Sequence, residues 1–246
     1  MERLFPDSGP TTVGDQLETF DPVQRAWDER PYTYTNFALT VDGHATIDGR
    51  SGAIGSDTDT DMLVALRTKA DAVMIGAGTM RAERYGRLIP DPMKRAVRER
   101  RGLPHDPLAV LVSRRLDLPW DAPMFTCGAG RVLIFTTSED DPPETATPVR
   151  VVRQSGEHVD LEAAVRHLRS ERGIRAMLCE GGPELHGKLL EASLVDELFI
   201  TVAPMLGGGR GAGLLHGLDD GGPELELSWL LRERGELFAR YRVIGR

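Results

Sequence analysis

The sequence predicts an α/β fold: a mostly parallel mixed sheet with antiparallel strands at its C-terminal edge. Short, unbroken apolar runs carry this prediction, because strands that are apolar on both faces are typical of parallel sheets covered by helices. Segments of helical period separate several of these runs. The C-terminal part instead has strand-like segments with no long helix between them, which indicates antiparallel pairing.

The first strand is expected at Tyr32–Thr40, which is rich in aromatic and β-branched residues and precedes the turn signal Asp42-Gly43. A short return strand is expected at 44–47, and a helix at 57–69 with Ser56 or Asp57 as its cap. The later strands are expected at 72–75, 108–112, 132–135, 149–152, 176–179, 197–203, 224–231 and 237–244. Further helices are expected after Gly76, at 160–172 and at 183–191, with a hairpin turn at 234–236 and loops at 140–148 and 207–222.

The domain organisation is expected to be simple. Residues 1–30 contain several prolines and acids and are expected to form a loosely structured N-terminal arm with one short helix at 22–30. Residues 31–246 show no internal repeat and no long linker, so a single domain is expected there.

Composition argues against several classes of function. The net charge of −8 argues against nucleic-acid binding, which requires a basic face. No apolar stretch reaches the roughly 20 residues that span a bilayer, and the N-terminus does not resemble a signal peptide, so a cytoplasmic protein is expected. Cys127 and Cys179 lack CxxC spacing, so both are expected to be buried free thiols. The six histidines are scattered, so no metal site is expected.

Three of the predicted strands end in residues that suit phosphate. The turn Gly76-Ala77-Gly78-Thr79 follows a buried strand and opens a helix, although a turn without a ligand is equally compatible with this pattern. The full GxGxxG fingerprint is absent, which disfavours an ordinary Rossmann site.

The other two strand ends add charge. Glu180-Gly181-Gly182-Pro183 follows another buried run, and the carboxylate of Glu180 suits a substrate amine. Ser113 and Arg114 follow a third run, where a hydroxyl and a guanidinium suit a phosphomonoester such as the 2′-phosphate of NADP. NADPH is therefore the expected cofactor.

These motifs together resemble a known family. The segments 36–43, 75–79, 180–183 and 194–198, with Ala203-Pro204 and the following glycine run, are similar to the bacterial pyrimidine reductase domain of riboflavin biosynthesis. The resemblance covers residues 31–245 and implies a three-layer dihydrofolate-reductase-like fold and a homodimer. It also implies NADPH-dependent reduction of 5-amino-6-(5-phosphoribosylamino)uracil.

The resemblance assigns roles to individual residues. It implies that Ala38 lies beside the nicotinamide, that Glu180 contacts the substrate, and that Asp42 belongs to the family's Ser-Leu-Asp-Gly turn, here Thr-Val-Asp-Gly. The other implied cofactor contacts are Gly76, Ala77, Gly78, Thr79, Glu83, Ser113, Arg114, Gly181, Gly182, Pro183, Glu184 and Leu185.

The sequence also departs from the family. The helix start at 56–61 is an acidic run where related enzymes tend to carry an arginine for the sugar phosphate. A second arginine, expected further along the chain after the acidic turn, has no clear counterpart, and Arg84, Arg87 and Arg95 are candidate substitutes for it. One carboxylate of the run, Asp59 first, could bind the amidine-like edge of a pterin or pyrimidine. A pterin reductase, a non-catalytic NADPH-binding module and a nucleotide-binding protein outside the family therefore remain as alternatives. The zinc signature of the deaminase that is often fused to this reductase is absent from the sequence.

Overall fold

A computed structural model describes residues 1–208, 212–215 and 221–245. Their contacts divide the chain into two compact units. The first unit comprises Met1–Asp21, Thr33–Leu66 and Pro183–Arg246, and the second comprises Pro22–Tyr32 and Arg67–Gly182. Because the chain enters each unit more than once, neither unit is a continuous segment of sequence.

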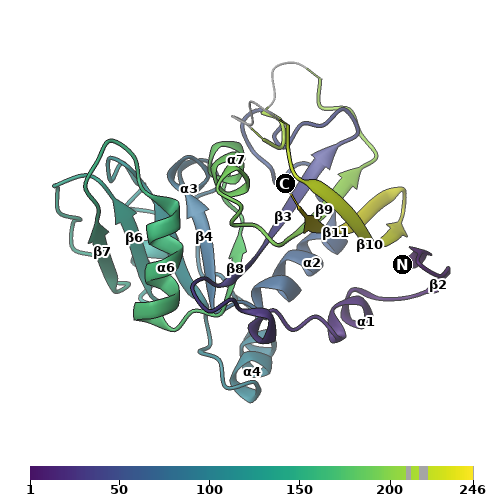
Figure 1. Ribbon diagram of the computed structural model, residues 1–246, viewed down its shortest axis with the longest axis horizontal. Coiled ribbons are helices and arrows are strands. Elements are labelled where there is room, and N and C mark those ends of the chain that lie inside the picture. The colour runs from purple at the N-terminus through teal and green to yellow at the C-terminus, as the bar shows by residue number, and fades with distance from the viewer. Residues whose placement is uncertain (209–211, 216–220, 246) are drawn as a thin grey trace. The chain divides into compact units, whose positions relative to one another are not determined.

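The first unit contains a mixed sheet with strands in the order β2-β1-β10-β11-β9-β3. Strand β3 is parallel to β9, and the remaining neighbours are antiparallel. Figure 1 shows the long hairpin of β10 and β11 in yellow. The elements of this unit are β1 (Glu2–Phe5), β2 (Gly9–Pro10), α1 (Val13–Glu18), β3 (Tyr32–Thr40), α2 (Asp57–Arg67), α7 (Pro183–Glu191), β9 (Glu197–Ala203), β10 (Glu224–Glu233) and β11 (Glu236–Ile244).

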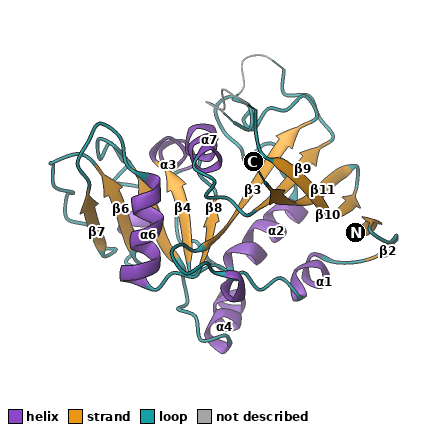
Figure 2. Ribbon diagram, in the orientation of Figure 1, coloured by secondary structure: helices purple, strands orange, loops and turns teal. Residues whose placement is uncertain are grey.

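The second unit contains an entirely parallel sheet in the order β8-β4-β5-β6-β7. Helices lie in most of the connections between its strands (Figure 2), whereas a loop joins β6 to β7. The elements are η1 (Val23–Arg25), β4 (Ala72–Gly76), α3 (Ala77–Glu83), α4 (Pro92–Arg100), β5 (Leu108–Val112), α5 (Pro123–Thr126), β6 (Val132–Thr136), β7 (Val149–Arg153), α6 (Leu161–Arg172) and β8 (Ala176–Cys179).

The predicted α/β class, with mainly parallel strands and antiparallel strands near the C-terminus, is confirmed. Strands β4 and β8 are apolar and almost wholly buried, which explains why their sequences carry no alternation. Helix α6 begins at Asp160, whose side chain accepts from the amide of Ala163, and ends at Gly173 in the left-handed conformation. These are ordinary start and stop signals, and they explain why the predicted boundaries hold.

Several predictions of secondary structure are wrong or incomplete. The helix expected at 22–30 is only the short 3₁₀ helix η1, and α5 was not predicted. Residues 44–47 form only isolated bridges, His44 with Gly213 and Ile47 with Arg50, rather than a strand. Helix α4 was not predicted, because its sequence is too polar to show an apolar stripe, although Asp91 and Pro92 are a strong helix start. Part of the predicted 207–222 loop, namely 209–211 and 216–220, lies outside the described residues.

The first thirty residues have more regular secondary structure than the loosely structured arm that was expected. Strand β1 pairs with both β10 and β2, and Thr12 and Asp15 form a capping box at the start of α1. Residues 1–21 cluster with the first unit and Pro22–Tyr32 with the second. The strand was missed because its partner β10 lies more than two hundred residues away in sequence. A single domain over 31–246 stays a prediction.

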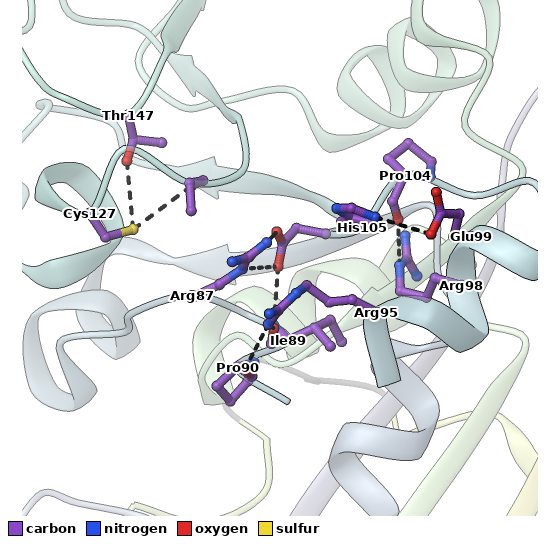
Figure 3. Close-up of polar contacts among 12 residues, drawn as sticks. Arg87, Ile89, Pro90, Arg95, Arg98, Glu99, Pro104, His105, Cys127 and Thr147 are labelled. Carbon is purple, nitrogen blue, oxygen red and sulfur yellow. Dashed lines mark hydrogen bonds and ion pairs between the residues drawn. The ribbon is translucent and has the colours of Figure 1, made fainter. Parts of the chain in front are cut away.

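Arg98 of α4 is a fully buried cation in the second unit. Its guanidinium donates to the carbonyl oxygens of Arg67, Thr68, Ala70 and Pro104, at 2.7 to 3.2 Å. Figure 3 shows the hydrogen bond to Pro104. These carbonyls include the C-terminal end of α2, where the helix dipole favours a positive charge. Arg98 therefore fixes the turn that connects Arg67 to β4.

In the part of the chain that the structure describes, every helix is too short or too polar to cross a membrane.

Candidate functional site

The carboxyl ends of β8, β4 and β5 lie side by side in the second unit. In the parallel register, Gly76 is opposite Val112 and Met74 is opposite Cys179. The glycine turn after β4, Ser113 after β5 and Glu180 after β8 are therefore at the same edge of one sheet. Ligands of α/β proteins bind at this edge.

Two of the predicted phosphate turns contact each other. Gly182 has a φ of +58°, and a Cβ atom added there would lie 2.8 Å from the hydroxyl oxygen of Thr79. Only glycine fits this close approach without strain. The turn after β4 and the turn after β8 thus present their backbones together, as a site for a pyrophosphate requires.

The end of β5 is rigid but accessible. Ser113 is buried and its amide donates to the carbonyl oxygen of Phe135 at 3.1 Å. The hydroxyls of Thr136 and Thr137 both donate to the carbonyl oxygen of Arg114, while the side chain of Arg114 is exposed. A fixed backbone with a free guanidinium suits a phosphate that approaches from solvent.

Glu180 is engaged by an arginine that the sequence analysis did not identify. Nε and Nη2 of Arg67 donate to the two carboxylate oxygens of Glu180 at 2.7 and 2.6 Å, and Nη1 donates to the carbonyl oxygen of Leu88. The side chain of Glu180 is 3% exposed and that of Arg67 is 11% exposed. Burial alone would lower the pKa of Arg67, but the charge and hydrogen bonds of Glu180 raise it above its ordinary value.

Tyr85 completes this cluster. Its ring lies under the guanidinium of Arg67, with Cζ 5.6 Å from the ring centre. Burial raises the pKa of its hydroxyl well above the ordinary value, and the nearby charge of Glu180 raises it further. The hydroxyl therefore remains a hydrogen-bond donor, and the pair of Arg67 and Glu180 can accept and donate hydrogen bonds without a net charge.

The arginines suggested by the sequence have other partners. Arg84 pairs with Asp121. Arg87 binds Asp106 through three hydrogen bonds, and Arg95 donates to the backbone carbonyls of Ile89 and Pro90 (Figure 3). No local pattern marks Arg67, because 113 positions separate it from Glu180. The one sequence signal that could have identified Arg67 is its place in the last turn of helix α2.

The neighbouring thiol is not a candidate nucleophile. Burial raises the pKa of Cys179 to about 12. Both cysteines are free thiols, with Cys179 buried and Cys127 exposed, so burial is as expected only for Cys179. Among the described residues, no group of three histidine, cysteine or acidic side chains is placed to hold a metal ion.

The remaining predicted residues belong to the first unit. Asp42 follows β3, and its carboxylate accepts from the hydroxyl of Thr40 and from the amides of Gly207 and Gly208. These hydrogen bonds, that of Thr40 first, hold the pKa of Asp42 well below its ordinary value. The ionised carboxylate of Asp42 therefore fixes the start of the glycine run. Its role as a catalytic residue stays a prediction.

Asp59 is the buried member of the acidic run, whereas Asp57 and Asp61 are exposed. Burial raises its pKa, a hydrogen bond from Thr201 lowers it, and the charge of Glu236 raises it. Ala38 lies on β3 opposite Thr201 of β9.

Helix α7 and the end of α3 supply the other predicted cofactor contacts. Pro183, Glu184 and Leu185 form the first turn of α7, where Glu184 is exposed and pairs with Lys188. Glu83 is the last residue of α3. The cofactor contacts expected of these residues stay predictions.

Comparison with known proteins identifies the family. The chain matches the model of the RibD C-terminal domain over residues 31–230. It is 31% identical over 186 residues to the 2,5-diamino-6-ribosylamino-4(3H)-pyrimidinone 5′-phosphate reductase of Archaeoglobus fulgidus, covering 74% of this chain and 84% of the relative. The protein of the same name from Methanothermobacter thermautotrophicus is 31% identical over 227 residues, covering 88% of this chain and all of the relative.

A solved structure agrees with these relatives. A pyrimidine reductase-like protein from Corynebacterium diphtheriae superposes with a TM-score of 0.80 at 26% identity, over 96% of this chain and 100% of that chain. The predicted resemblance to the pyrimidine reductases of riboflavin biosynthesis is thus confirmed at the level of the family. This chain belongs to the RibD C-terminal domain family.

Proposed function

We propose that this chain is an NADPH-dependent reductase of riboflavin biosynthesis that acts on a ribosylaminopyrimidine phosphate. The relatives in the family carry names for this reduction. The observation that supports it most directly is the buried pair of Arg67 and Glu180 beside two glycine turns at the carboxyl edge of the second unit's sheet. The bacterial type of the enzyme stays a prediction, because archaeal relatives match as well.

The residues present fit a dinucleotide. Gly182 lets the turn after β8 approach the hydroxyl of Thr79 at a place where any side chain would clash, and this close approach brings the two glycine turns together. In the proposal, the amides of 76–79 and of Gly181 and Gly182 bind the pyrophosphate, and Ser113 and Arg114 bind the 2′-phosphate. When bound, NADPH supplies the hydride. Ala38 beside the nicotinamide and the first turn of α7 are part of the same proposal.

Arg67, Glu180 and Tyr85 are proposed to bind the substrate's polar groups. Arg67 holds the carboxylate of Glu180 in place through two hydrogen bonds, and in the proposal this carboxylate also accepts a hydrogen bond from a substrate amine. Reduction of the ribosyl carbon to the ribityl product would consume one hydride, which NADPH would supply when bound, and one proton, which would be taken up from the solvent. Orientation of the ribosyl carbon and exclusion of water are the contributions this buried cluster makes.

The test is a spectrophotometric assay of NADPH oxidation. We expect turnover with 2,5-diamino-6-ribosylamino-4(3H)-pyrimidinone 5′-phosphate or with 5-amino-6-(5-phosphoribosylamino)uracil, and a clear preference for NADPH over NADH. Tight NADPH binding without turnover of either compound, or of dihydrofolate, would identify a non-catalytic binding module. Turnover of dihydrofolate alone would identify a pterin reductase. Equal affinity for NADH and NADPH would contradict the proposed 2′-phosphate site at Ser113 and Arg114.

The proposal includes a homodimer in the cytoplasm. Leu237 of β11 is 36% exposed and Leu225 of β10 is 42% exposed, and alternation along β11 places Leu237 and Val243, the register partner of Leu225, on the same face. On β9, Val202 is the register partner of Leu237 and is only half-buried. An apolar sheet face of this kind suits a second copy of the chain.

A further inference from the structure

A small surface hollow lies in the second unit, at the amino ends of β5 and β6. Three segments line it, namely the loop after α3 with Leu88, the residues that lead into β5 with Pro107, and the residues between α5 and β6 with Gly130. It has a volume of about 250 Å³, including the part that is open to solvent. Ser113 lies at the other end of β5, so the hollow is separate from the site described above.

The negative charge in the wall of the hollow is already neutralised. Asp106 is the one acid among the lining residues, and its side chain is 6% exposed. Its two oxygens accept three hydrogen bonds from Arg87 at 2.7 to 3.1 Å and one from the amide of Ile89 at 3.4 Å. A second cation, Arg131, also lines the hollow, so two arginines and one aspartate give the wall a net charge of +1.

Several hydrogen-bond donors in this wall are unused. Within the described residues, Nη1 of Arg87 and the guanidinium of Arg131 have no acceptor. The amides of Ala129 and Gly130 have none there either. The side chain of Arg87 is 32% exposed and Arg131 is exposed, so a ligand can reach both. Two guanidinium groups with nearby backbone amides suit a phosphate-type oxyanion, which accepts several hydrogen bonds at once.

The hollow is connected to the cluster around Arg67 by two hydrogen bonds. Leu88 lines the hollow, and its carbonyl oxygen accepts from Nη1 of Arg67 at 3.1 Å. Met124 also lines it, and its amide donates at 2.8 Å to the carbonyl oxygen of Tyr85, whose ring lies under the guanidinium of Arg67. A ligand in the hollow would therefore contact residues that hold this cluster in place.

We propose that the hollow binds a phosphate-type oxyanion through Arg87, Arg131 and the amides of Ala129 and Gly130, and that the bound anion holds the loop at 85–89 in place. The inference goes beyond the proposed function, which assigns cofactor and substrate to the carboxyl ends of the strands. A ligand that binds the loop only in its folded position lowers the population of loop-open states. Phosphate is thereby a positive effector of the cluster around Arg67.

Cys127 is a natural reporter beside the hollow. Its Sγ lies 3.9 Å from the carbonyl oxygen of Ala129 and 3.9 Å from the hydroxyl of Thr147 (Figure 3). Hydrogen bonding to Asp106 is the main cause that raises the pKa of Arg87, and the charge of Cys127 contributes to the same shift. An anion bound to Arg87 therefore disfavours the Cys127 thiolate, which is the form that alkylating reagents attack.

The other thiol does not interfere with this reporter. Cys179 is fully buried, and burial raises its pKa to about 12. Alkylation of the native protein therefore reports on Cys127 alone.

The first experiment measures the rate at which N-ethylmaleimide alkylates the full chain as inorganic phosphate replaces chloride at constant ionic strength. We expect phosphate to slow alkylation in a saturable manner. In Arg131→Gln the phosphate concentration for half of this effect should rise at least about tenfold, because a charge-assisted contact is lost. Arg166→Gln is the matched control, since Arg166 is an exposed arginine on α6, and it should behave like the wild type.

The second experiment follows amide hydrogen exchange by NMR in the same proteins. Phosphate should slow exchange at the amides of Met124 and Ile89 in the wild type and in Arg166→Gln, but not at the same concentration in Arg131→Gln. Alkylation that phosphate does not slow, or that it slows equally in the wild type and Arg131→Gln, would overturn the site. Slower alkylation with unchanged exchange at both amides would overturn the link to Arg67. Neither measurement requires turnover, so failure of the proposed function would leave both results interpretable.

Discussion

Acidification should destabilise the protein through one buried imidazole, His186. This side chain lies in the first half of α7 and is fully buried. Its ring packs on Phe37 of β3, with the ring centres 3.8 Å apart. Neither ring nitrogen has a hydrogen-bond partner among the described residues. Burial lowers the pKa of His186 from its ordinary 6.5 to about 3.

The sign of the effect follows from these two pKa values. Between pH 6.5 and 3 the unfolded chain binds a proton at this histidine and the folded chain does not. Stability therefore falls as the pH falls through this window. Each pH unit below the unfolded pKa costs about 1.4 kcal/mol, so about 2 kcal/mol is lost at pH 5. With a urea m-value of about 2 kcal/mol/M, this moves the unfolding midpoint by about 1 M.

The assay compares urea midpoints at pH 7.5 and pH 5 for the wild type and for His186→Leu. Other titrating groups act in both proteins, so the difference between the two shifts belongs to His186. We expect His186→Leu to lose less stability on acidification, and to match or exceed the wild type at pH 7.5 because two unpaired nitrogens are removed. His158→Gln, at an exposed position, should behave like the wild type. Equal shifts in the wild type and His186→Leu would refute the reasoning.

Three further substitutions test the fold, the cofactor turns and the assembly. Arg98→Met leaves buried carbonyls without a donor, and we expect urea denaturation to show a loss of about 3–5 kcal/mol. Gly182→Ala forces a side chain against the adjacent turn at positive φ, and calorimetry should show NADPH binding weakened at least about tenfold. Gly52→Ala, with open space around it, should not change NADPH binding. Leu237→Lys places a charge on the exposed sheet face, and sedimentation should show a monomer where the wild type is a dimer.

The sequence predicted the strands of the second unit well for a physical reason. Strands such as Leu108–Val112 and Ala176–Cys179 are buried, so their continuous apolar runs are visible without any knowledge of partners. Helix α4 and strand β1 were not predicted, because they are stabilised by contacts with distant residues rather than by a local sequence pattern. Arg98 holds α4 through distant carbonyls, and β1 depends on β10.

In the candidate site, too, features with a local sequence signal could be predicted and contacts between distant residues could not. Glycine turns at strand ends are local signals, so Gly76 and Gly182 could be identified from the sequence. The choice of Asp59 from its acidic run was also accessible, because it shares the apolar face of α2 with Met62 and Leu66. Ion pairs between distant positions have no local signal, and the arginine partner of Glu180 was therefore invisible.

The pair of Arg67 and Glu180 offers a way to separate stability from function. Arg67→Met leaves the carboxylate of Glu180 buried without a positive partner, which costs about 3–5 kcal/mol in comparable cases. Replacing both residues by methionine removes the unpaired charge, so we expect the double variant to recover most of the urea midpoint lost by the single variant. We expect neither protein to oxidise NADPH with the pyrimidine substrate, since the polar groups that bind it are gone. A double variant as unstable as Arg67→Met would mean that the pair is needed for folding, and a double variant that retains turnover would mean that the substrate binds elsewhere. If the double variant recovers stability but not activity, the buried ion pair serves the reaction rather than the stability of the core.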